Sequence, residues 1–435
     1  MKSQAVVLAG GFGTRLVDLI GSDIPKPMAK IFGRPLLEWT LDCLKRNKIK
    51  NVLFLLHHNH EYIQNHFNNG KKFGININYS IEKTPRGTAG AIYDNIEKLE
   101  KEFFIIYGDT FLDINLLDMK SSKKKDDSLV ALVHPSSHPL DSDLIKMNSN
   151  NKIIEIFKQN KSKNKYYKNL TNAALYYCEG NIFKNQKILT KGVVDISSNL
   201  IPKLIKSGKT IKGYLSSEYI KDMGTPERYI KVEENVANNV PSLLSLRNKR
   251  KCVFLDRDGV VNYEKGHLNN IDDFEIRPEI ISLIKLFNTN GWLTIIITNQ
   301  PVIARGELSF KGLEDIHNKM DTILGNKGAY IDGLYFCPHH PDSGFDGEVK
   351  ELKINCECRK PKPGLINKAI EDFNINPLES WLIGDNERDI EAALNAKVNP
   401  ILLDESKKEN YLNTEDNVTV SNSITTIYNF LREKI

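Results

Sequence analysis

The chain has 435 residues, a length that predicts two or three domains, each large enough to bury its own core. Its apolar content of 40% and charged content of 26% are those of an ordinary globular protein, and its net charge is +5. The basic runs lack interleaved aromatic residues, so they do not favour nucleic acid as a partner. No apolar run approaches membrane-spanning length and the chain starts directly in an apolar strand, so we expect a cytoplasmic protein with no membrane partner.

A buried strand followed by a glycine-rich turn is predicted at the start of the chain. Residues 4–9 are mostly apolar and run into Gly10-Gly-Phe-Gly-Thr-Arg-Leu16. The glycines let backbone N–H groups close on phosphate oxygens, and Arg15 supplies a fixed bidentate charge. Lys26 follows between two prolines that stiffen the backbone. The turn has neither the Gly-Lys-Ser/Thr of a P-loop nor the glycine spacing of a dinucleotide fingerprint.

Three further segments of the first half carry polar groups at predicted strand or helix ends. Glu82 precedes a second glycine turn, Gly87-Thr-Ala89, that leads into a helix. Asp109 ends the apolar strand 102–107, and Asp222 follows another extended stretch. Two aspartates at strand ends are able to converge on one Mg²⁺ ion, which prefers oxygen ligands.

These segments resemble the sugar-1-phosphate nucleotidyltransferases, whose signature is L-A-G-G-x-G-T-R-L followed by P-K-P. The resemblance covers about residues 3–232 and implies a Rossmann-like α/β domain with a mixed sheet. It implies that Arg15 and Lys26 stabilise transition-state charge, that Asp109 and Asp222 hold Mg²⁺, and that Asn172 contacts the sugar. Ala174 stands where the family usually has glycine. The implied nucleotide-binding residues are Leu8, Ala9, Gly10, Gly11, Gly13, Thr14, Arg15, Gly87, Thr88 and Ala89.

A second catalytic domain is predicted after residue 250. We expect a first domain over 1–235, a basic linker over 236–250 and a second domain over 251–435. The apolar strand 252–255 ends in Asp256 and Asp258, two carboxylates that suit nucleophilic attack on phosphorus and proton transfer. Strands ending in Thr298 and Gly384 follow, with Lys360 between them and acids at 385 and 389.

This series resembles the haloacid dehalogenase superfamily, whose fold is a parallel α/β sheet. The resemblance implies that Asp256 is the nucleophile and Asp258 the general acid and base. It implies that Thr298 and Lys360 hold the transferring phosphoryl group. Its implied Mg²⁺ ligands are Asp256, Asp258 and Asp385.

Cysteine and histidine residues cluster in the sequence between Thr298 and Lys360. Cys337-x-His339 is followed after 16 residues by Cys356-x-Cys358. Three thiolates and one imidazole fit a closed tetrahedral Zn²⁺ site of structural type. The loop resembles that of the D,D-heptose 1,7-bisphosphate phosphatases, and this resemblance implies substrate contacts from Asn299, Arg305 and Arg359.

In the first domain Gly108-Asp-Thr-Phe-Leu-Asp113 and Glu82 with Gly87-Thr88 look most like the D-glycero-D-manno-heptose 1-phosphate guanylyltransferases. The two resemblances together therefore predict a bifunctional enzyme of GDP-heptose biosynthesis. Its small-molecule partners would be heptose 1,7-bisphosphate, heptose 1-phosphate and GTP, with Mg²⁺ in both sites and structural Zn²⁺. Another nucleotide or sugar in the first domain, and a histidinol-phosphate type of substrate in the second, stay open alternatives. An inactive scaffold domain is disfavoured because every expected carboxylate is present, and the sequence leaves a homo-oligomer open.

Overall fold

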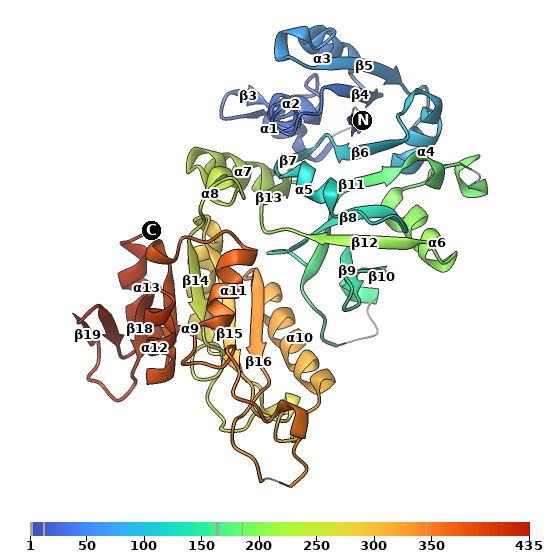
Figure 1. The fold of residues 1–435 in the computed structure, drawn as a ribbon. Coiled ribbons are helices and arrows are strands. Elements are labelled where there is room, and N and C mark those ends of the chain that lie inside the picture. The colour runs from blue at the N-terminus through green and yellow to red at the C-terminus, as the bar shows by residue number, and fades with distance from the viewer. Residues whose placement is uncertain (1–2, 12–13, 162–164, 185, 345) are drawn as a thin grey trace. The chain divides into compact units, whose positions relative to one another are not determined.

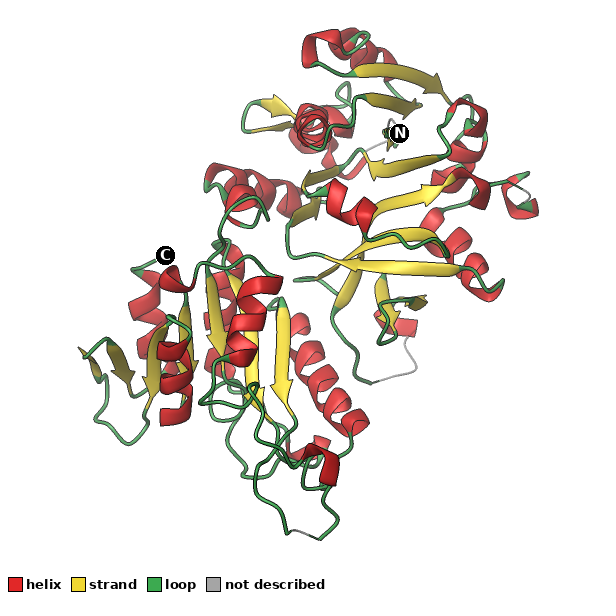
Figure 2. Cartoon of the chain, in the orientation of Figure 1, coloured by secondary structure: helices red, strands yellow, loops and turns green. Residues whose placement is uncertain are grey.

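The computed structural model describes residues 3–11, 14–161, 165–184, 186–344 and 346–435 (Figure 1). The chain divides into two compact units. The first unit comprises Met1–His134, Ser142–Lys161 and Leu170–Ser245, and the second comprises Pro135–Asp141, Ser162–Asn169 and Leu246–Ile435. In each unit strands form a sheet with helices packed against it, which Figure 2 shows as yellow and red layers. Within the described residues, no helix is long and apolar enough to cross a membrane.

The first unit is built on a nine-stranded mixed sheet. Its strands are β1 (Gln4–Leu8), β4 (Asn51–Leu56), β5 (Asn76–Ile81), β6 (Glu102–Tyr107), β8 (Asp127–Pro135), β9 (Leu144–Met147), β10 (Ile153–Phe157), β11 (Leu170–Glu179) and β12 (Thr210–Leu215). Two small ribbons pair β7 (Thr110–Asp113) with β13 (Tyr219–Asp222), and β2 (Lys30–Ile31) with β3 (Arg34–Pro35). The helices are α1 (Val17–Ile20), α2 (Leu36–Arg46), α3 (His60–Phe67), α4 (Gly87–Tyr93), α5 (Leu116–Ser121), α6 (Ile201–Lys206), α7 (Pro226–Ala237) and α8 (Val240–Leu243).

The strand order of this sheet determines where a ligand can bind. The path runs β10-β9-β11-β6-β1-β4-β5, with β1 parallel to both β4 and β6. Alternate residues of β1 enter two cores: Val7 packs with the residues of α2, and Val6 with those of α4 and α6. After β1 the chain adds β4 and β5 on one side of it and then adds β6 on its other side. The strand order therefore reverses between β1 and β6. Open α/β sheets bind ligands at the carboxyl ends of the strands at such a point.

The second unit has a seven-stranded sheet in the order β16-β15-β14-β17-β18-β20-β19. Every pairing is parallel except that of the edge strand β19 with β20. The strands are β14 (Cys252–Leu255), β15 (Leu293–Asn299), β16 (Gly333–Cys337), β17 (Trp381–Gly384), β18 (Asn399–Leu403), β19 (Leu412–Glu415) and β20 (Val418–Ser421). The helices are α9 (Pro278–Thr289), α10 (Phe310–Asn326), α11 (Gly364–Asp372), α12 (Glu387–Asn395) and α13 (Ile424–Arg432).

The core of the second unit lies where α9, α10 and α13 cover one face of its sheet. Val253 and Leu255 of β14 enter that core, while Phe254 points to the opposite face. The reversal point here lies between β14 and β17, so the ends of these two strands form the expected binding edge. The two α/β units, one with a mixed and one with a nearly all-parallel sheet, confirm the predicted fold class.

Two details differ from the domain limits expected from the sequence. The segment around Tyr167 packs within the second unit, where the Tyr167 N–H donates to Thr322 Oγ1 of α10 over 2.9 Å. The stretch expected to be a linker contains the end of α7 and all of α8. Long-range packing of this kind leaves no local signal in hydrophobic periodicity. The assignment of one catalytic domain to each side of residues 236–250 stays a prediction.

Candidate active sites

A pocket of about 260 Å³ opens at the carboxyl ends of β1 and β6 in the first unit. It is lined by residues from the two glycine turns, from the lysine segment and from the strand ends. The lining residues are Leu8, Ala9, Gly10, Gly11, Lys26, Pro27, Leu55, Glu82, Pro85, Gly87, Thr88, Ala91, Tyr107, Asp109 and Asp195. Most of the residues expected to bind a nucleotide thus share one cavity.

In the first glycine turn, Gly10 packs against a neighbouring strand end, whereas Gly11 faces open space. A Cβ on Gly10 would lie 3.2 Å from His57 Cβ, whereas a Cβ on Gly11 would meet nothing within 4 Å. Gly11 therefore presents backbone to open space, as a phosphate cradle requires. Gly13, also expected to bind the nucleotide, lies outside the described residues, as does the side chain of Thr14.

The second glycine turn is fixed by a neighbouring segment. The Thr88 N–H donates to Asp195 Oδ1 over 3.1 Å, and the Ala89 N–H donates to the Val194 carbonyl over 2.9 Å. A Cβ on Gly87 would lie 2.6 Å from the Val194 oxygen. Gly87 and Thr88 line the pocket, while Ala89 is buried behind them. Because the N–H groups of Thr88 and Ala89 already donate within the protein, the turn contributes a wall of the pocket and not donors for a phosphate.

The two aspartates expected to hold metal are neighbours through the β7–β13 ribbon. Asp222 pairs in register with Thr110, and the Met223 N–H donates to the Asp109 carbonyl over 3.0 Å. Each carboxylate has a basic partner: Lys26 Nζ donates to Asp109, and Arg228 lies 2.8 Å from Asp222. Asp109 lines the pocket, and Asp222 does not.

Two other residues expected in the first site, Arg15 and Asn172, do not line this pocket. Arg15 is exposed and approaches the Asp222 turn, because a Cβ on Gly224 would lie 3.8 Å from Arg15 Nη2. Asn172 donates through Nδ2 to the Tyr176 hydroxyl over 2.7 Å and is half-buried. Neither Arg15 nor Asn172 lines the described cavity. Ala174, two residues after Asn172, has φ +55°, in the left-handed region that favours glycine.

In the second unit a buried ion-pair cluster lies at the ends of β14 and β17. Lys360 Nζ lies 2.9 Å from Asp256 Oδ1 and 2.6 Å from Asp389 Oδ1, and it donates to the Ile297 carbonyl over 2.9 Å. Burial raises the pKa of Asp256, and Lys360 opposes this shift. Burial also works against the charge on Lys360, but the two carboxylates raise its pKa overall. The nucleophile predicted from the sequence is therefore held by the predicted lysine.

Asp258 points into a separate hydrogen-bond network. Arg257 Nη2 donates to Asp258 over 2.8 Å and Gln300 Nε2 donates to it over 2.8 Å, while the same Gln300 amide donates to Thr298 Oγ1 over 2.8 Å. Although burial opposes the charged form, Arg257 and the amide donors lower the pKa of Asp258. Its carboxylate is thereby fixed next to Thr298 as an ionised group.

Arg257 is in turn held by His317, a half-buried residue of α10. Its Nη1 lies 3.2 Å from His317 Nε2, and the guanidinium is fully buried. Burial, with the adjacent Arg257, lowers the pKa of His317 to about 3. His317 is therefore neutral, and its Nε2 accepts the hydrogen bond from Arg257.

Three carboxylates of the second unit lie close enough to share a cation. Oxygens of Asp256, Asp385 and Asp389 all lie within 4.8 Å of one another. Burial raises the pKa of Asp385 to about 6. Gly259 has φ +84°, and a Cβ there would lie 1.9 Å from Asp385 Oδ2, so only glycine allows the two turns to meet. This set of three carboxylates suits Mg²⁺. The ligand set predicted from the sequence had Asp258 as its third carboxylate, whereas the group that lies together in the structure has Asp389.

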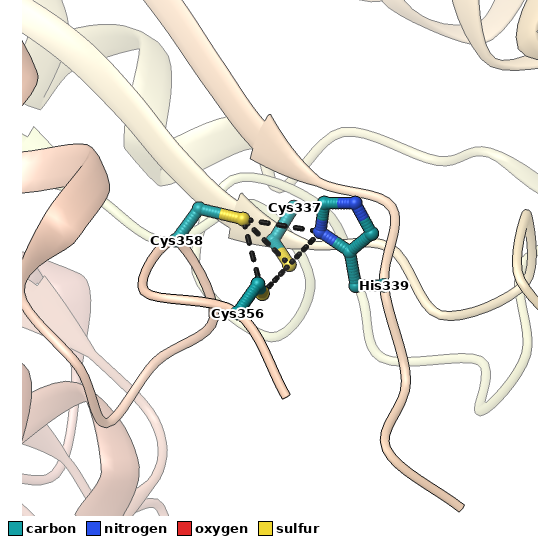
Figure 3. A group of neighbouring side chains, drawn as sticks. All are labelled: Cys337, His339, Cys356 and Cys358. Atoms are coloured by element: carbon teal, nitrogen blue, oxygen red, sulfur yellow. Dashed lines mark hydrogen bonds between the residues drawn. The ribbon is translucent and has the colours of Figure 1, made fainter. Parts of the chain in front are cut away.

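The cysteine and histidine cluster forms as predicted from its spacing (Figure 3). The sulfur–sulfur distances are 3.5 Å for Cys337–Cys356, 3.3 Å for Cys337–Cys358 and 3.2 Å for Cys356–Cys358. His339 Nδ1 lies 3.2 Å from the Cys358 sulfur. A tetrahedral site with metal–sulfur bonds of about 2.3 Å needs ligand separations of roughly this size. The four side chains fit one metal ion with no vacant ligand position.

Comparison with known proteins identifies both units. The family model described as nucleotidyl transferase matches residues 4–239, and the one described as HAD-hydrolase-like matches residues 357–425. The D-glycero-beta-D-manno-heptose-1,7-bisphosphate 7-phosphatase of Yersinia pestis is 39% identical over 147 residues, which are 34% of this chain and 76% of that protein. The enzyme of the same name from Pasteurella multocida is 36% identical over 172 residues, 38% of this chain and 91% of that protein. The chain belongs to both families, the nucleotidyl transferases and these phosphatases.

We therefore call the two units the transferase unit and the phosphatase unit. A crystal structure of HddC from Yersinia pseudotuberculosis is 24% identical in sequence and covers 54% of this chain and 99% of its own, with a TM-score of 0.47. The family matches confirm the two resemblances stated from the sequence, and with them the prediction of a nucleotidyltransferase fused to a phosphatase.

The rim of the phosphatase site carries the other residues expected to bind substrate. Asn299 Oδ1 accepts from the Lys360 N–H over 3.1 Å and so positions the lysine segment. Arg359 Nη1 donates to the His339 carbonyl over 3.2 Å, which ties this guanidinium to the metal loop. Arg305 Nη1 lies 3.3 Å from His267 Nδ1. Their contacts with substrate stay predictions.

The structure adds site residues to which the sequence analysis gave no role. Asp389 and Gln300 complete the phosphatase site, and Arg228 and Asp195 hold groups of the transferase site. Asp389 had a usable signal, because it lies in the first turn of α12, directly after the strand end that carries Asp385. Gln300 and Arg228 lie near Thr298 and Asp222 in sequence, but nothing in the pattern predicts their contacts, whereas Asp195 is 107 residues from Thr88.

Proposed function

We propose that the chain catalyses two consecutive steps toward GDP-heptose. The phosphatase unit removes the 7-phosphate of D-glycero-D-manno-heptose 1,7-bisphosphate, and the transferase unit joins the heptose 1-phosphate to GMP from GTP. The observation that supports this pairing most strongly is the presence, in one chain, of a phosphatase unit with its Asp256–Lys360 pair and a transferase unit with its Lys26–Asp109 pocket. The heptose 1-phosphate left by the first step is the type of substrate that the second consumes.

In the phosphatase step, an Asp256 carboxylate oxygen attacks phosphorus and the bond to the sugar oxygen breaks. Asp258 supplies the proton to that leaving oxygen and then takes one from the water that hydrolyses the phospho-aspartate. Lys360 and Thr298 stabilise the phosphoryl charge. Because the Asp258 carboxylate is ionised in the Arg257 network, it must gain its proton as substrate binds.

Magnesium suits the three carboxylates of the phosphatase unit. Asp256, Asp385 and Asp389 would hold it, and the ion would reduce the repulsion between these acids and the substrate phosphate. We propose Zn²⁺ in the cluster of Cys337, His339, Cys356 and Cys358, where its role is structural.

In the transferase step, an oxygen of the sugar 1-phosphate attacks the α-phosphorus of the nucleotide and pyrophosphate leaves. Lys26 and Arg15 stabilise the charge that spreads over the phosphoryl oxygens. Asp109 and Asp222 would hold Mg²⁺ once the nucleotide phosphates displace Lys26 and Arg228 from them. No covalent intermediate is needed in this step.

The choice of guanine is supported by Glu82. This half-buried carboxylate lines the pocket, and its Oε1 accepts from the Arg86 N–H over 3.3 Å. A carboxylate only accepts hydrogen bonds when ionised, and guanine presents two adjacent donors, N1–H and the 2-amino group. The other bases place an acceptor beside their donor, so they suit this side chain less well.

The pairing of the two steps is tested by following phosphate and pyrophosphate release from the heptose 1,7-bisphosphate with Mg²⁺ and each nucleoside triphosphate. We expect GTP to give both products. Asp256→Asn should abolish both, and Asp109→Asn should abolish only pyrophosphate. If the bisphosphate gives neither product while histidinol phosphate is hydrolysed, the proposed substrates are wrong.

The base assignment has its own test. Glu82→Gln replaces one acceptor with a donor and so matches uracil, which offers one donor and one acceptor. The ratio of kcat/KM for GTP over UTP should fall by about 10- to 100-fold, the size of one bidentate base contact. Glu61→Gln, an exposed substitution on α3, is the matched control. An unchanged ratio in Glu82→Gln would remove Glu82 from base recognition.

A further inference from the structure

A second hollow, of about 440 Å³, lies in the transferase unit where the strands begin. Gln4, Asn51 and Asn76 stand in register at the starts of β1, β4 and β5, so the loops before them meet along one edge of the sheet. The hollow lies at that edge. Its lining residues are Ser3, Lys48, Lys50, Asn51, Lys71, Gly74, Ile75 and Asn76.

The charge of this hollow is entirely of one sign. Lys48, Lys50 and Lys71 line it and are exposed, and we call them the basic-pocket lysines. None of its lining residues is acidic, and among the ion pairs of the described residues none includes these three lysines.

Two further ammonium groups lie beside the hollow. A Cβ on Gly74 would lie 3.3 Å from Lys45 Nζ, and Lys120 Nζ donates to Ser3 Oγ over 2.8 Å. Like charges gathered without a counter-charge repel one another, and a bound anion removes that cost. Asn51, Asn76 and Ser3 add side chains able to donate hydrogen bonds to the same anion.

The hollow is separate from the catalytic pocket. Strands rise about 3.3 Å per residue, so the length of β1 places the two ends of the sheet roughly 17 Å apart. A ligand held at the strand starts therefore contacts neither Lys26 nor Asp109.

We propose that the basic pocket binds a small ligand with a diphosphate group, as an effector and not as a reacting substrate. A diphosphate carries several charges in a compact group, which matches three lysines around one hollow. Two sources have this chemistry: free pyrophosphate, and the diphosphate bridge of a nucleotide-linked sugar. The proposal stands apart from the choice of sugar and base made above.

Lysine acetylation read by mass spectrometry tests the site residue by residue. The full chain is acetylated with inorganic pyrophosphate, with GDP-mannose or with neither. At ten times the dissociation constant, occupancy should slow acetylation of the basic-pocket lysines by about tenfold. Three exposed lysines on other elements are the references and should react unchanged: Lys187, Lys206 and Lys209.

Each outcome of that experiment decides something. Protection by pyrophosphate, or by GDP-mannose alone, supports the site and names the source of the diphosphate. Equal rates with and without both probes overturn the proposal. Protection by duplex DNA without protection by either small probe also overturns it, because the hollow would then be part of a polyanion-binding surface.

A charge-removal variant gives an independent check. Lys48→Gln/Lys50→Gln/Lys71→Gln should lose one of the pyrophosphate binding events seen by calorimetry in the wild type and keep nucleotidyl transfer in the absence of effector. The matched control, Lys187→Gln/Lys206→Gln/Lys209→Gln, removes the same charge elsewhere and should keep every event. If the first variant retains the full number of binding events, the basic pocket is not a diphosphate site.

Discussion

The two catalytic sites use the same pair of groups at different depths. Both lie at the reversal point of a sheet, and in both a lysine contacts an aspartate at a strand end. The Asp109 side chain is 37% exposed, whereas the Asp256 side chain is 6% exposed. Transfer between two bound substrates needs room for both, but a nucleophile that forms a covalent intermediate works better where water is limited. The two lysine–aspartate pairs therefore differ in their burial and not in their residue types.

The comparison is tested most strongly by removing the buried carboxylate of Asp256, the proposed nucleophile. Asp256→Asn should lower phosphate release by at least about 10³-fold, because no other carboxylate replaces an attacking group. Transfer from supplied heptose 1-phosphate and GTP should be unchanged. The exposed Asp273→Asn is the control and should keep both activities. Equal loss of both activities would contradict the independence of the two sites.

Loss of the lysine in the open site should have a smaller effect than loss of the aspartate in the buried site. Lys26→Met should lower nucleotidyl transfer by about 10²- to 10³-fold, the effect of removing one preorganised donor from phosphoryl charge. Phosphate release should not change. Lys30→Met, four residues on and exposed, should behave as wild type in a coupled pyrophosphate assay. A Lys26→Met enzyme with full transfer activity would show that the Asp109 contact is not catalytic.

Loss of the metal from the cysteine and histidine cluster should lower the stability of the phosphatase unit and not that of the transferase unit. Cys356→Ser leaves three ligands in the cluster, so the phosphatase unit should lose metal and at least about 2 kcal/mol, or roughly 4–8 °C in melting temperature. His340→Gln removes a neighbouring imidazole outside the ligand set and should retain the metal. Metal content by mass spectrometry and calorimetric melting provide the measurement. A full metal content in Cys356→Ser would refute the site.

Acid should weaken the phosphatase unit through His317. Its folded pKa of about 3 lies below the ordinary value of 6.5, so between these values the unfolded chain binds a proton that the folded chain does not. The stabilisation is complete above pH 6.5 and is lost as the pH falls. His317→Gln should reduce the pH dependence of the unfolding free energy by about 1.4 kcal/mol per pH unit between pH 4 and 6.

In a Trp39→Phe background, urea unfolding followed by the fluorescence of Trp292 and Trp381 reports on the phosphatase unit. The exposed His267→Gln is the matched control. A His317→Gln protein with the wild-type pH dependence would mean that His317 is protonated in the folded state, in conflict with its contact to Arg257.

The smallest expected effect is that of a substitution in β11 of the transferase unit. Ala174 has φ +55°, so Ala174→Gly removes backbone strain that outweighs the added freedom of the unfolded chain. We expect about 0.5–1 kcal/mol of stabilisation in the transferase unit alone. Ala173→Gly, at the preceding buried position, should destabilise by a similar amount and is the control. Stabilisation of neither unit by Ala174→Gly would contradict the strain.

Much of this architecture is predictable because parallel strands bring their carboxyl ends to one edge. That rule alone places Asp256 near Asp385 and Gly10 near Asp109. The metal cluster is equally local, since its four ligands come from two short motifs. The family resemblances supplied the roles that spacing leaves open.

The rest depends on contacts between segments that no motif links. Gln300 bridges Thr298 to Asp258 only because β15 ends beside β14. Arg228 contacts Asp222 through the start of α7, and Asp195 reaches Thr88 from a loop more than a hundred residues away. Such partners follow from packing, so a single sequence does not reveal them.

The contact of Gly259 with Asp385 has a consequence for how this gene can change. Because a single added methyl group would overlap the carboxylate, every substitution at codon 259 should act as a null allele of the phosphatase while the transferase is still made. A collection of random mutants, selected for loss of phosphatase with full-length protein retained, should therefore return this codon repeatedly. Geneticists could use it to switch off the earlier step of the pathway without touching a reacting group.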